Sequence, residues 1–326
     1  MRGASSILFV GAGLAPAAVA LAQARGVQLI TLPPHPPEEK MIETIEAHQP
    51  DVIIMRSGKL SGAAIRVAKR LKLVTKHGVG VDSIDVTTAT AQKIPVAFAA
   101  GANSQSVAEH AFALMFAAAR NIVALDHAAR HGSWDKVPGQ ELTGKTLGLI
   151  GFGTISRRLA ELVEPLRMRI LVHDPYVAAE SLPLSYGVAS SIDALVCDSD
   201  VVSLHCPLTP ETANMFDARR FALMRDGAML INTARGGLID EAALVAALKD
   251  GKLSGAGLDT VASEPPGPDS PLWAAPNLVV TPHVGADTAE ARERVGVMVM
   301  EQALAAIEGR LPDQWMVANP IALKAA

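Results

Sequence analysis

The sequence predicts an α/β protein of two Rossmann-like or flavodoxin-like domains, each built on a parallel sheet, with a cleft between them. Three observations carry this prediction. At 326 residues the chain is too long for one small core. Short apolar runs alternate with helical stretches, which is typical of parallel sheets covered by helices. Aromatic residues make up only 4% of a chain that is 49% hydrophobic, so its cores are mainly aliphatic, as in sheets buried on both faces.

The first domain begins with this alternation near the N-terminus. Its expected strands are the apolar runs 7–12, 27–33, 51–57, 71–78 and 94–100. Its expected helices are the segments 16–25, 37–48 and 61–71. Pro16 suits a first helical turn, because the amides of that turn have no partner within the helix. Glu38 and Glu39 place negative charge at the start of the second helix, where its dipole favours it.

The segment 104–130 is rich in alanine and apolar nearly all round, a pattern typical of buried helices. A subunit interface would cover such a surface, so we expect a homodimer through this region. The alternative is a helix buried between the two domains of one chain.

A second alternation starts at residue 146. Its strand-like runs are 146–151, 169–175, 200–207, 228–234, 255–259 and 277–283, enough for a complete dinucleotide-binding domain. A last helix from about Ala289 to Glu308 is expected to pack back on the first domain. We therefore predict a discontinuous substrate-binding domain, residues 1–103 plus 290–326, and an NAD-binding domain, residues 104–289.

Composition argues against several classes of partner. The formal net charge is −4 and no basic block stands out, so we expect no nucleic-acid partner. The two cysteines, Cys197 and Cys206, favour neither a disulfide framework nor a zinc site, and no metal is expected. Gly and Pro interrupt the apolar segment 7–22, and no charge-free run is long enough to span a membrane. We expect a cytoplasmic protein with no membrane partner.

A glycine-rich turn follows the run that starts at residue 146. Gly151 allows a tight turn, Gly153 lets the backbone approach a pyrophosphate, and Ser156 replaces the usual third glycine. Asp174 ends the next strand, where an acid can accept hydrogen bonds from ribose hydroxyls and repel a 2′-phosphate. This favours NAD over NADP, whereas the alternative for Asp174 is a turn residue before Pro175.

Three further residues stand where loops follow strands. Arg235 precedes two glycines after the run 228–234, and its planar fork can bind a carboxylate and a neighbouring carbonyl oxygen. Glu264 and His283 follow the next two runs, and a carboxylate bonded to an imidazole is the pairing expected of a general acid/base. Each residue alone has a plain structural alternative in a surface loop, so the prediction depends on their joint occurrence.

The first domain offers a second candidate site. Gly78, Val79 and Gly80 expose consecutive backbone amides, which suit a substrate carboxylate. Arg56 and Lys76 can flank the same position and bind a second anionic group on the substrate. Solvated surface charge is the alternative for both side chains.

Several motifs together resemble the D-isomer-specific 2-hydroxyacid dehydrogenase family, over nearly the whole chain. They are GVGVDSID at 78–85, SVAEH at 106–110, GFGTI at 151–155, HCPLTPET at 205–212, NTARGG at 232–237, D-x-x-x-x-E-P at 259–265 and TPHVGADTAEA at 281–291. The resemblance implies that Arg235 binds and polarises the substrate, that His283 is the acid/base and that Glu264 is its partner. It implies cofactor contacts at Gly151, Gly153, Thr154, Ile155, Asp174, His205, Pro207, Thr212, Thr233, Ala234, Asp259 and Gly285.

The resemblance also bears on the substrate and on regulation. Arg56 and Lys76 fall where phosphoglycerate dehydrogenases carry basic side chains. The chain ends at Ala326, so we expect no appended regulatory domain. Ser156 and the pair Thr260–Val261 depart from the family's usual residues, and neither departure affects the catalytic positions.

Together these features predict an NAD-dependent oxidoreductase that interconverts a small 2-oxo acid and its 2-hydroxy acid. The resemblance implies that the hydroxy acid is the D isomer, which is usual in the family. Two alternatives stay open. One is an NAD(H)-sensing regulatory protein of the corepressor type. The other is a formate dehydrogenase, although that family carries Gln where Glu264 stands. Neither the particular hydroxy acid nor the physiological direction follows from the sequence.

Overall fold

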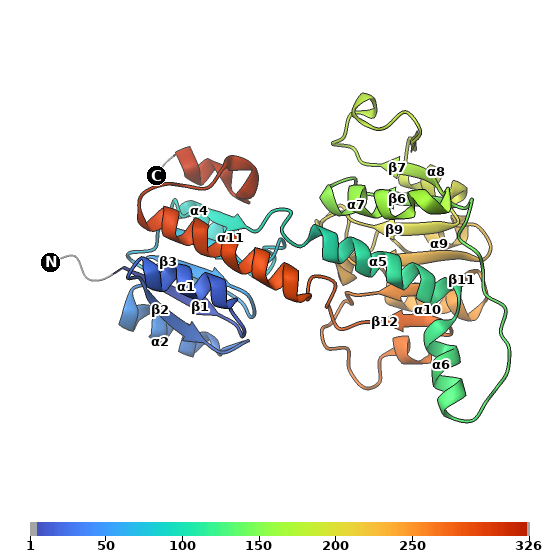
Figure 1. Ribbon diagram of the computed structural model, residues 1–326, viewed down its shortest axis with the longest axis horizontal. Helices are drawn as coiled ribbons and strands as arrows, with labels where there is room; N and C mark the ends of the chain where they lie inside the picture. Colours follow the sequence, from blue (N-terminus) through green and yellow to red (C-terminus); the bar gives the residue numbers. More distant parts are fainter. Residues whose placement is uncertain (1–4, 325–326) are drawn as a thin grey trace. The chain divides into compact units, whose positions relative to one another are not determined.

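The structure of the chain is a computed structural model that describes residues 5–324. It divides into two compact units: one comprises the chain up to Asn103 and from Ala286 onward, and the other is Ser104–Gly285. Each unit contains one sheet, and every strand pair in both sheets is parallel (Figure 1). The predicted α/β class with two parallel sheets is confirmed.

The first unit has a five-stranded sheet in the order β2-β1-β3-β4-β5, which is the flavodoxin-like order. Its strands are β1 (Ser6–Val10), β2 (Gln28–Leu32), β3 (Val52–Met55), β4 (Leu73–Lys76) and β5 (Val96–Phe98). Its helices are α1 (Pro16–Ala24), α2 (Glu38–His48), α3 (Gly62–Val67), α4 (Val86–Ala91) and α11 (Ala289–Ile307). Helix α4 was not predicted. All five expected strands are present, each shorter than its apolar run because the flanking residues form the turns.

Helix α3 ends earlier than its pattern predicts, and the side chain of the residue that follows α2 explains this. The expected helix ran to residue 71, but the last helical residue is Val67. The amide of Gln49 donates to the Val67 carbonyl at 3.1 Å and accepts from the Lys69 amide at 2.8 Å. These bonds satisfy backbone groups that would otherwise continue the helix.

Helix α11 packs on the first sheet together with α1, although the two helices are far apart in the sequence (Figure 1). The approach is close at Gly296, where an added Cβ would lie 2.9 Å from the Cβ of Ala15. The second boundary between the units lies at Gly285/Ala286, whereas the sequence predicted it at 289/290. Ion pairs from Asp287 to Arg56 and Arg292 attach the intervening residues to the first unit.

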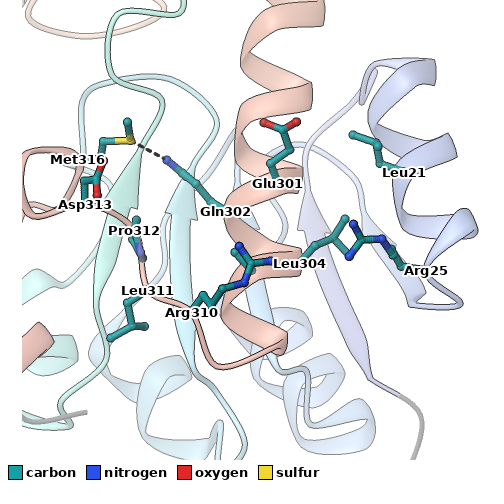
Figure 2. A pocket seen from close by; sticks show the side chains of 11 residues that line it. Leu21, Arg25, Glu301, Gln302, Leu304, Arg310, Leu311, Pro312, Asp313 and Met316 are labelled. Atoms are coloured by element: carbon teal, nitrogen blue, oxygen red, sulfur yellow. Dashed lines mark hydrogen bonds between the residues drawn. The ribbon is translucent and has the colours of Figure 1, made fainter.

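A pocket of the first unit lies among α1, α11 and residues 310–316 (Figure 2). Its two arginines are paired, because Arg25 and Arg310 both form ion pairs with Glu308. Gln302 in α11 donates to the sulfur of Met316 at 3.7 Å. None of the predicted site residues lines this pocket, so it plays no part in the candidate chemistry.

The second unit has a seven-stranded sheet in the order β12-β11-β10-β9-β6-β7-β8. Its strands are β6 (Thr146–Ile150), β7 (Arg169–His173), β8 (Gly187–Val188), β9 (Val201–Leu204), β10 (Ala228–Asn232), β11 (Leu253–Leu258) and β12 (Leu278–Val280). Its helices are α5 (Ser104–Ala119), α6 (Ile122–Arg130), α7 (Thr154–Val163), α8 (Ile192–Asp198), α9 (Ala218–Leu223) and α10 (Glu241–Lys249). Six of these strands were expected. The edge strand β8 was missed because two residues carry no periodic signal.

The alanine-rich segment 104–130 forms two helices and not one. Asn121 adopts a left-handed conformation, with φ 53°, and separates α5 from α6, which meet at a bend of 61°. Helix α5 is largely buried, but α6 buries none of its residues within this chain, so the alternative of burial inside one chain fits α5 and does not fit α6. Among residues 5–324 no single helix is long and apolar enough to cross a membrane, although this bent pair passes the same test jointly by length and composition.

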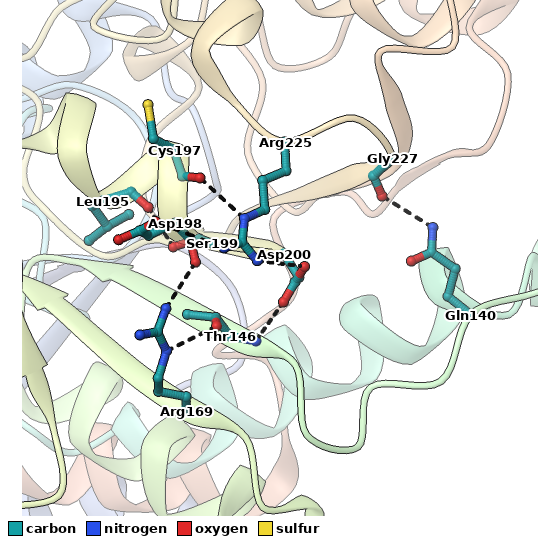
Figure 3. A network of polar contacts seen from close by, with 10 residues as sticks. All are labelled: Gln140, Thr146, Arg169, Leu195, Cys197, Asp198, Ser199, Asp200, Arg225 and Gly227. Atoms are coloured by element: carbon teal, nitrogen blue, oxygen red, sulfur yellow. Dashed lines mark hydrogen bonds and ion pairs between the residues drawn. The ribbon is translucent and has the colours of Figure 1, made fainter.

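Polar side chains tie together the amino ends of the central strands of the second sheet (Figure 3). The carboxylate of Asp200 accepts from the Thr146 amide at 2.8 Å and pairs with Arg225 at 3.2 Å. Arg169, at the start of β7, donates to the Thr146 hydroxyl at 3.2 Å. This edge is therefore occupied by structural contacts, and the opposite edge, at the carboxyl ends of the strands, is where ligands bind in such sheets.

Candidate active site

The three candidate catalytic residues follow three neighbouring strands of the second sheet. Strands β10, β11 and β12 pair in parallel in that order. Arg235 stands three residues after the end of β10, Glu264 follows β11 and His283 follows β12. Because parallel strands bring their carboxyl ends to one edge, all three loops emerge from the same side of the sheet.

Glu264 and His283 form a hydrogen-bonded pair. The Nδ1 atom of His283 lies 2.8 Å from Oε2 of Glu264, and both side chains are about half exposed, at 48% and 41%. The other carboxylate oxygen accepts from the Val261 amide at 3.3 Å, which orients the carboxylate. With Nδ1 bonded to Glu264, Nε2 is the ring atom available for proton exchange with a substrate.

The backbone at His283 is held in an uncommon conformation. His283 has φ 53°, in the left-handed region that non-glycine residues rarely adopt. Its amide donates at 2.9 Å to the carbonyls of both Asp259 and Thr281. A conformation of this kind persists where the surroundings over-determine it.

Asp259 provides most of those surroundings. Its carboxylate accepts from the Thr281 hydroxyl at 2.7 Å, the Val284 amide at 2.9 Å and the Gly285 amide at 2.8 Å. Gly285 has to be a glycine here, because an added Cβ would lie 2.9 Å from the Asp259 carboxylate. The resemblance implied cofactor contacts for Asp259 and Gly285. In the structure these two residues, together with Thr281, bind one another and shape the loop that carries His283, a role that sequence reasoning missed.

Replacing Asp259 with asparagine should lower the free energy of unfolding by about 2 kcal/mol at pH 7. Burial alone would raise the pKa of Asp259, but hydrogen bonds from His110, Thr281 and two amides lower it from 3.8 to about 2. The ionised carboxylate therefore stabilises the fold fully above pH 3.8, and this contribution is lost as the pH falls through about 2.

Urea unfolding of both proteins at pH 7 and pH 3 measures this effect. The difference in the free energy of unfolding between wild type and Asp259→Asn should be smaller at pH 3 than at pH 7. The exposed Asp269, changed to asparagine, serves as a control and should change stability by less than about 0.5 kcal/mol. An equally large difference at both pH values would trace the effect to shape and not to charge.

The loop that carries Arg235 is held by Asn232, a fully buried residue at the end of β10. The side chain of Asn232 accepts from the Ala234 amide at 3.0 Å and donates to the Arg235 carbonyl at 2.8 Å. Gly236 lies so close to Val261 that an added Cβ would fall 2.0 Å from its carbonyl carbon. This contact joins the loop of Arg235 to the loop of Glu264. The motif NTARGG contained Asn232, but no role was predicted for it.

The glycine-rich turn has the geometry of a dinucleotide-binding turn. Gly151 has φ 85°, and a Cβ there would lie 2.8 Å from the carbonyl oxygen of His205. Gly153 caps α7, whose first residues are Thr154 and Ile155, and the space around its Cβ position is open. Such a helix end favours an anion. Ser156 is buried and its hydroxyl donates to the Gly151 carbonyl at 2.5 Å, which ties the helix to the turn.

Asp174 supports this turn with both carboxylate oxygens. One oxygen accepts from the Phe152 amide at 2.7 Å and the other from the Tyr176 amide at 2.8 Å. The second bond is the turn role predicted as the alternative for Asp174. A carboxylate oxygen can accept more than one hydrogen bond, so these bonds are compatible with ribose hydroxyls as further donors.

The residues around the turn fit a dinucleotide. The hydroxyl oxygen of Thr233 is buried beside Ala234 without a hydrogen-bond partner among the described residues, as expected where a ligand supplies one. Burial lowers the pKa of His205 to about 4, so its imidazole is neutral at pH 7, and its Nε2 lies 2.8 Å from the Ser203 hydroxyl. Thr212 accepts from the Thr209 amide and donates to the Pro207 carbonyl at 2.8 Å, which shapes the 207–212 loop.

The predicted anion site of the first unit is present only in part. The amide of Gly78 donates at 2.9 Å to the carbonyl of Lys76, so Gly78 is a poor donor for a substrate. The amides of Val79 and Gly80 make no backbone hydrogen bond among residues 5–324 and keep that possibility. A substrate contact of Gly78 stays a prediction, although the tight turn that its φ of 144° allows already uses its amide.

Arg56 and Lys76 are engaged with the loops around them. Arg56 donates to the carbonyls of Ala12 and Gly13 and pairs with Asp287 at 3.4 Å. Burial, aided by the charge of Arg292, lowers the pKa of Arg56, whereas Asp287 raises it. Lys76 donates at 3.2 Å to the Arg56 carbonyl and to a serine hydroxyl. Both side chains thus shape the first unit, and a second role in substrate binding stays a prediction.

The fold and this geometry define a dinucleotide-binding protein with a hydrogen-bonded histidine–glutamate pair at the carboxyl edge of its larger sheet. Residues 112–285 match the family described as D-isomer specific 2-hydroxyacid dehydrogenase, NAD binding domain. A hydroxypyruvate reductase from Thermotoga maritima is 42% identical over 77% of this chain and 83% of its own length. The chain therefore belongs to the D-isomer specific 2-hydroxyacid dehydrogenase family, as its motifs indicated.

Two further comparisons concern the length of the chain and its fold. A D-3-phosphoglycerate dehydrogenase from Archaeoglobus fulgidus is 40% identical over 83% of this chain but only 52% of its own length. The chain thus spans about half the length of that relative. The crystal structure of a glyoxylate reductase from Paecilomyes thermophila is similar over 97% of this chain and 99% of that one, with a TM-score of 0.87 and 30% identity.

Proposed function

We propose that this protein is an NAD-dependent oxidoreductase that interconverts a small 2-oxo acid and its 2-hydroxy acid, with D stereochemistry. The observation that carries the proposal is the Glu264–His283 pair, at 2.8 Å, on the same sheet edge as Arg235 and the glycine-rich turn. Membership of the family supports it, because the matched segment is described as its NAD-binding domain.

In this proposal Arg235, His283 and Glu264 have distinct tasks. Arg235 binds the carboxylate of the substrate and polarises its carbonyl oxygen, for which a planar bidentate cation is suited. His283 donates a proton from Nε2 to that oxygen in reduction and removes it in oxidation, and Glu264 stabilises the imidazolium form. When bound, the nicotinamide supplies or accepts the hydride.

The test is the loss of NADH absorbance with a panel of 2-oxo acids. The panel holds glyoxylate, hydroxypyruvate, pyruvate, 3-phosphohydroxypyruvate, sulfopyruvate and branched-chain 2-oxo acids. Because relatives are named hydroxypyruvate reductase, glyoxylate reductase and D-3-phosphoglycerate dehydrogenase, we expect the fastest turnover with hydroxypyruvate, glyoxylate or 3-phosphohydroxypyruvate. A strong preference for substrates that carry a second anionic group would assign Arg56 and Lys76 to the recognition of that group. Bound NADH without turnover of any member would favour the NAD(H)-sensing alternative.

Replacing Asp174 with alanine should weaken NADH binding by about 10-fold and improve the relative use of NADPH. The variant loses the acceptor proposed for the ribose hydroxyls and the negative charge that disfavours a 2′-phosphate. Dissociation constants for both cofactors, from fluorescence titration, measure the change. Asp174→Asn removes the charge but keeps one acceptor oxygen, so it should also favour NADPH, with a smaller loss of NADH binding. An unchanged ratio of the two constants would reduce Asp174 to a turn residue.

We also propose a homodimer through residues 104–130. Helix α6 is unburied within the chain, and four large apolar side chains in or just after it are exposed: Ile122, Val123, Trp134 and Val137. Light scattering after size exclusion measures the mass, and a monomer at micromolar concentration would overturn this proposal.

A further inference from the structure

His110, named above only as a hydrogen-bond donor to Asp259, has a side chain that reaches the loop of the candidate acid/base. It is the seventh residue of α5, the helix with which the second unit begins. Its Nε2 atom lies 2.8 Å from the Thr281 hydroxyl and 3.3 Å from Oδ1 of Asp259. Its side chain is 22% exposed, and that of Asp259 is 2% exposed.

The direction of these hydrogen bonds follows from the donors available. The Thr281 hydroxyl lies 2.7 Å from Oδ1 of Asp259 and has a single proton to donate to that carboxylate. It must then accept from His110, so Nε2 of His110 carries a proton. The result is a directed chain from the imidazole through the hydroxyl to the carboxylate.

The carboxylate at the end of this chain acts on the backbone around His283. It accepts from the amides of Val284 and Gly285, and the Asp259 carbonyl accepts from the amide of His283 itself. Cδ2 of the His110 ring would lie 3.6 Å from a Cβ added at Gly285, so the ring also packs against this loop. The left-handed backbone of His283 is thus held by groups that His110 orients from a different element.

We propose that His110 is a positioning residue for the reaction: through Thr281 and Asp259 it holds the 281–285 loop in the conformation that presents His283. The reaction itself is that of the proposed function, on which this inference rests. Within the described residues no hydrogen bond joins His110 to Glu264 or His283, so it acts through the loop and not as an acid or base.

Two substitutions separate a hydrogen-bonding role from simple packing. His110→Leu fills similar space without a donor, whereas His110→Gln keeps an amide nitrogen near the position of Nε2. In the leucine variant we expect kcat to fall by about 10-fold, with the NADH dissociation constant changed by less than about 3-fold. The glutamine variant should recover most of the lost kcat. Glu109→Gln, an exposed neighbour on the same helix, is the matched control and should behave like wild type.

Thr281→Val gives a second route that leaves His110 in place. It removes the bridging hydroxyl and keeps the branched shape. If one chain carries the effect, the double variant Thr281→Val, His110→Leu should lose little more kcat than the worse single variant. Multiplied losses would show that the two residues act separately and would overturn the proposal.

Hydrogen exchange decides the matter independently of turnover. In the NADH-free protein, the amides of Val284 and Gly285 should exchange at least about 10-fold faster in the leucine variant than in wild type, and nearly normally in the glutamine variant. Unchanged exchange in the leucine variant, or equal defects in the leucine and glutamine variants, would overturn the proposal. A wild-type protein that reduces no 2-oxo acid would instead contradict the proposed function, and the exchange result would still decide the role of His110.

Discussion

Replacing His283 with alanine should lower kcat by at least ~10²-fold, the usual scale for removing a general acid. NADH binding should stay nearly intact, because the side chain contacts Glu264 and not the glycine-rich turn. Steady-state kinetics with the best 2-oxo acid of the panel, together with NADH titration, measure both quantities. The pair is about half exposed in the structure, so the variant leaves no buried cavity and should fold.

The matched control for this variant is His48→Ala, in the last turn of α2, where the imidazole is exposed and far from the loop in the sequence. It should leave kcat unchanged. Glu264→Gln should lower kcat by less than the alanine change at His283, since the amide still accepts from Nδ1 but no longer stabilises an imidazolium. Near-normal turnover in His283→Ala would remove the acid/base assignment altogether.

Replacing Arg235 with glutamine should lower kcat/KM on the order of 10²–10³-fold, or about 3–4 kcal/mol, the scale for losing one partner of a desolvated charge pair. Arg235→Lys should recover little of it, because a point charge cannot reproduce a planar, bidentate contact. Since Arg235 is proposed to bind the substrate and polarise it, both KM and kcat should change.

A control for charge alone is Arg219→Gln, an exposed arginine paired with Asp193 on the same unit. That change should leave kcat/KM within about 2-fold of wild type. If Arg235→Lys has full activity, the proposed bidentate contact is wrong, and the positive charge alone accounts for the role of Arg235. If neither variant at position 235 affects the kinetics, Arg235 is a loop residue that supports the backbone only.

Much of the fold could be predicted because strands buried on both faces appear in the sequence as continuous apolar runs of four to eight residues. The predicted strands of both sheets are present, as is the helix near the C-terminus that packs on the first sheet. The errors have specific causes. Strand β8 is too short to carry a pattern. Gln49, which follows α2, ends α3 by hydrogen bonds from its side chain, and Asn121 divides the alanine-rich segment into two helices.

The positions of Arg235, Glu264 and His283 after strand ends were likewise readable from the chain, because a strand's end is a local property and parallel strands share one edge. The conformations of the loops that present them were not. The left-handed backbone of His283 depends on Asp259 and Thr281, and these depend on His110, which precedes Thr281 by 171 residues. The same is true of Arg56, whose guanidinium is engaged by the Ala12–Gly13 turn and by Asp287. Periodicity records which residues are buried within one element, whereas a hydrogen bond between elements requires both partners in place, and no short stretch of sequence contains both.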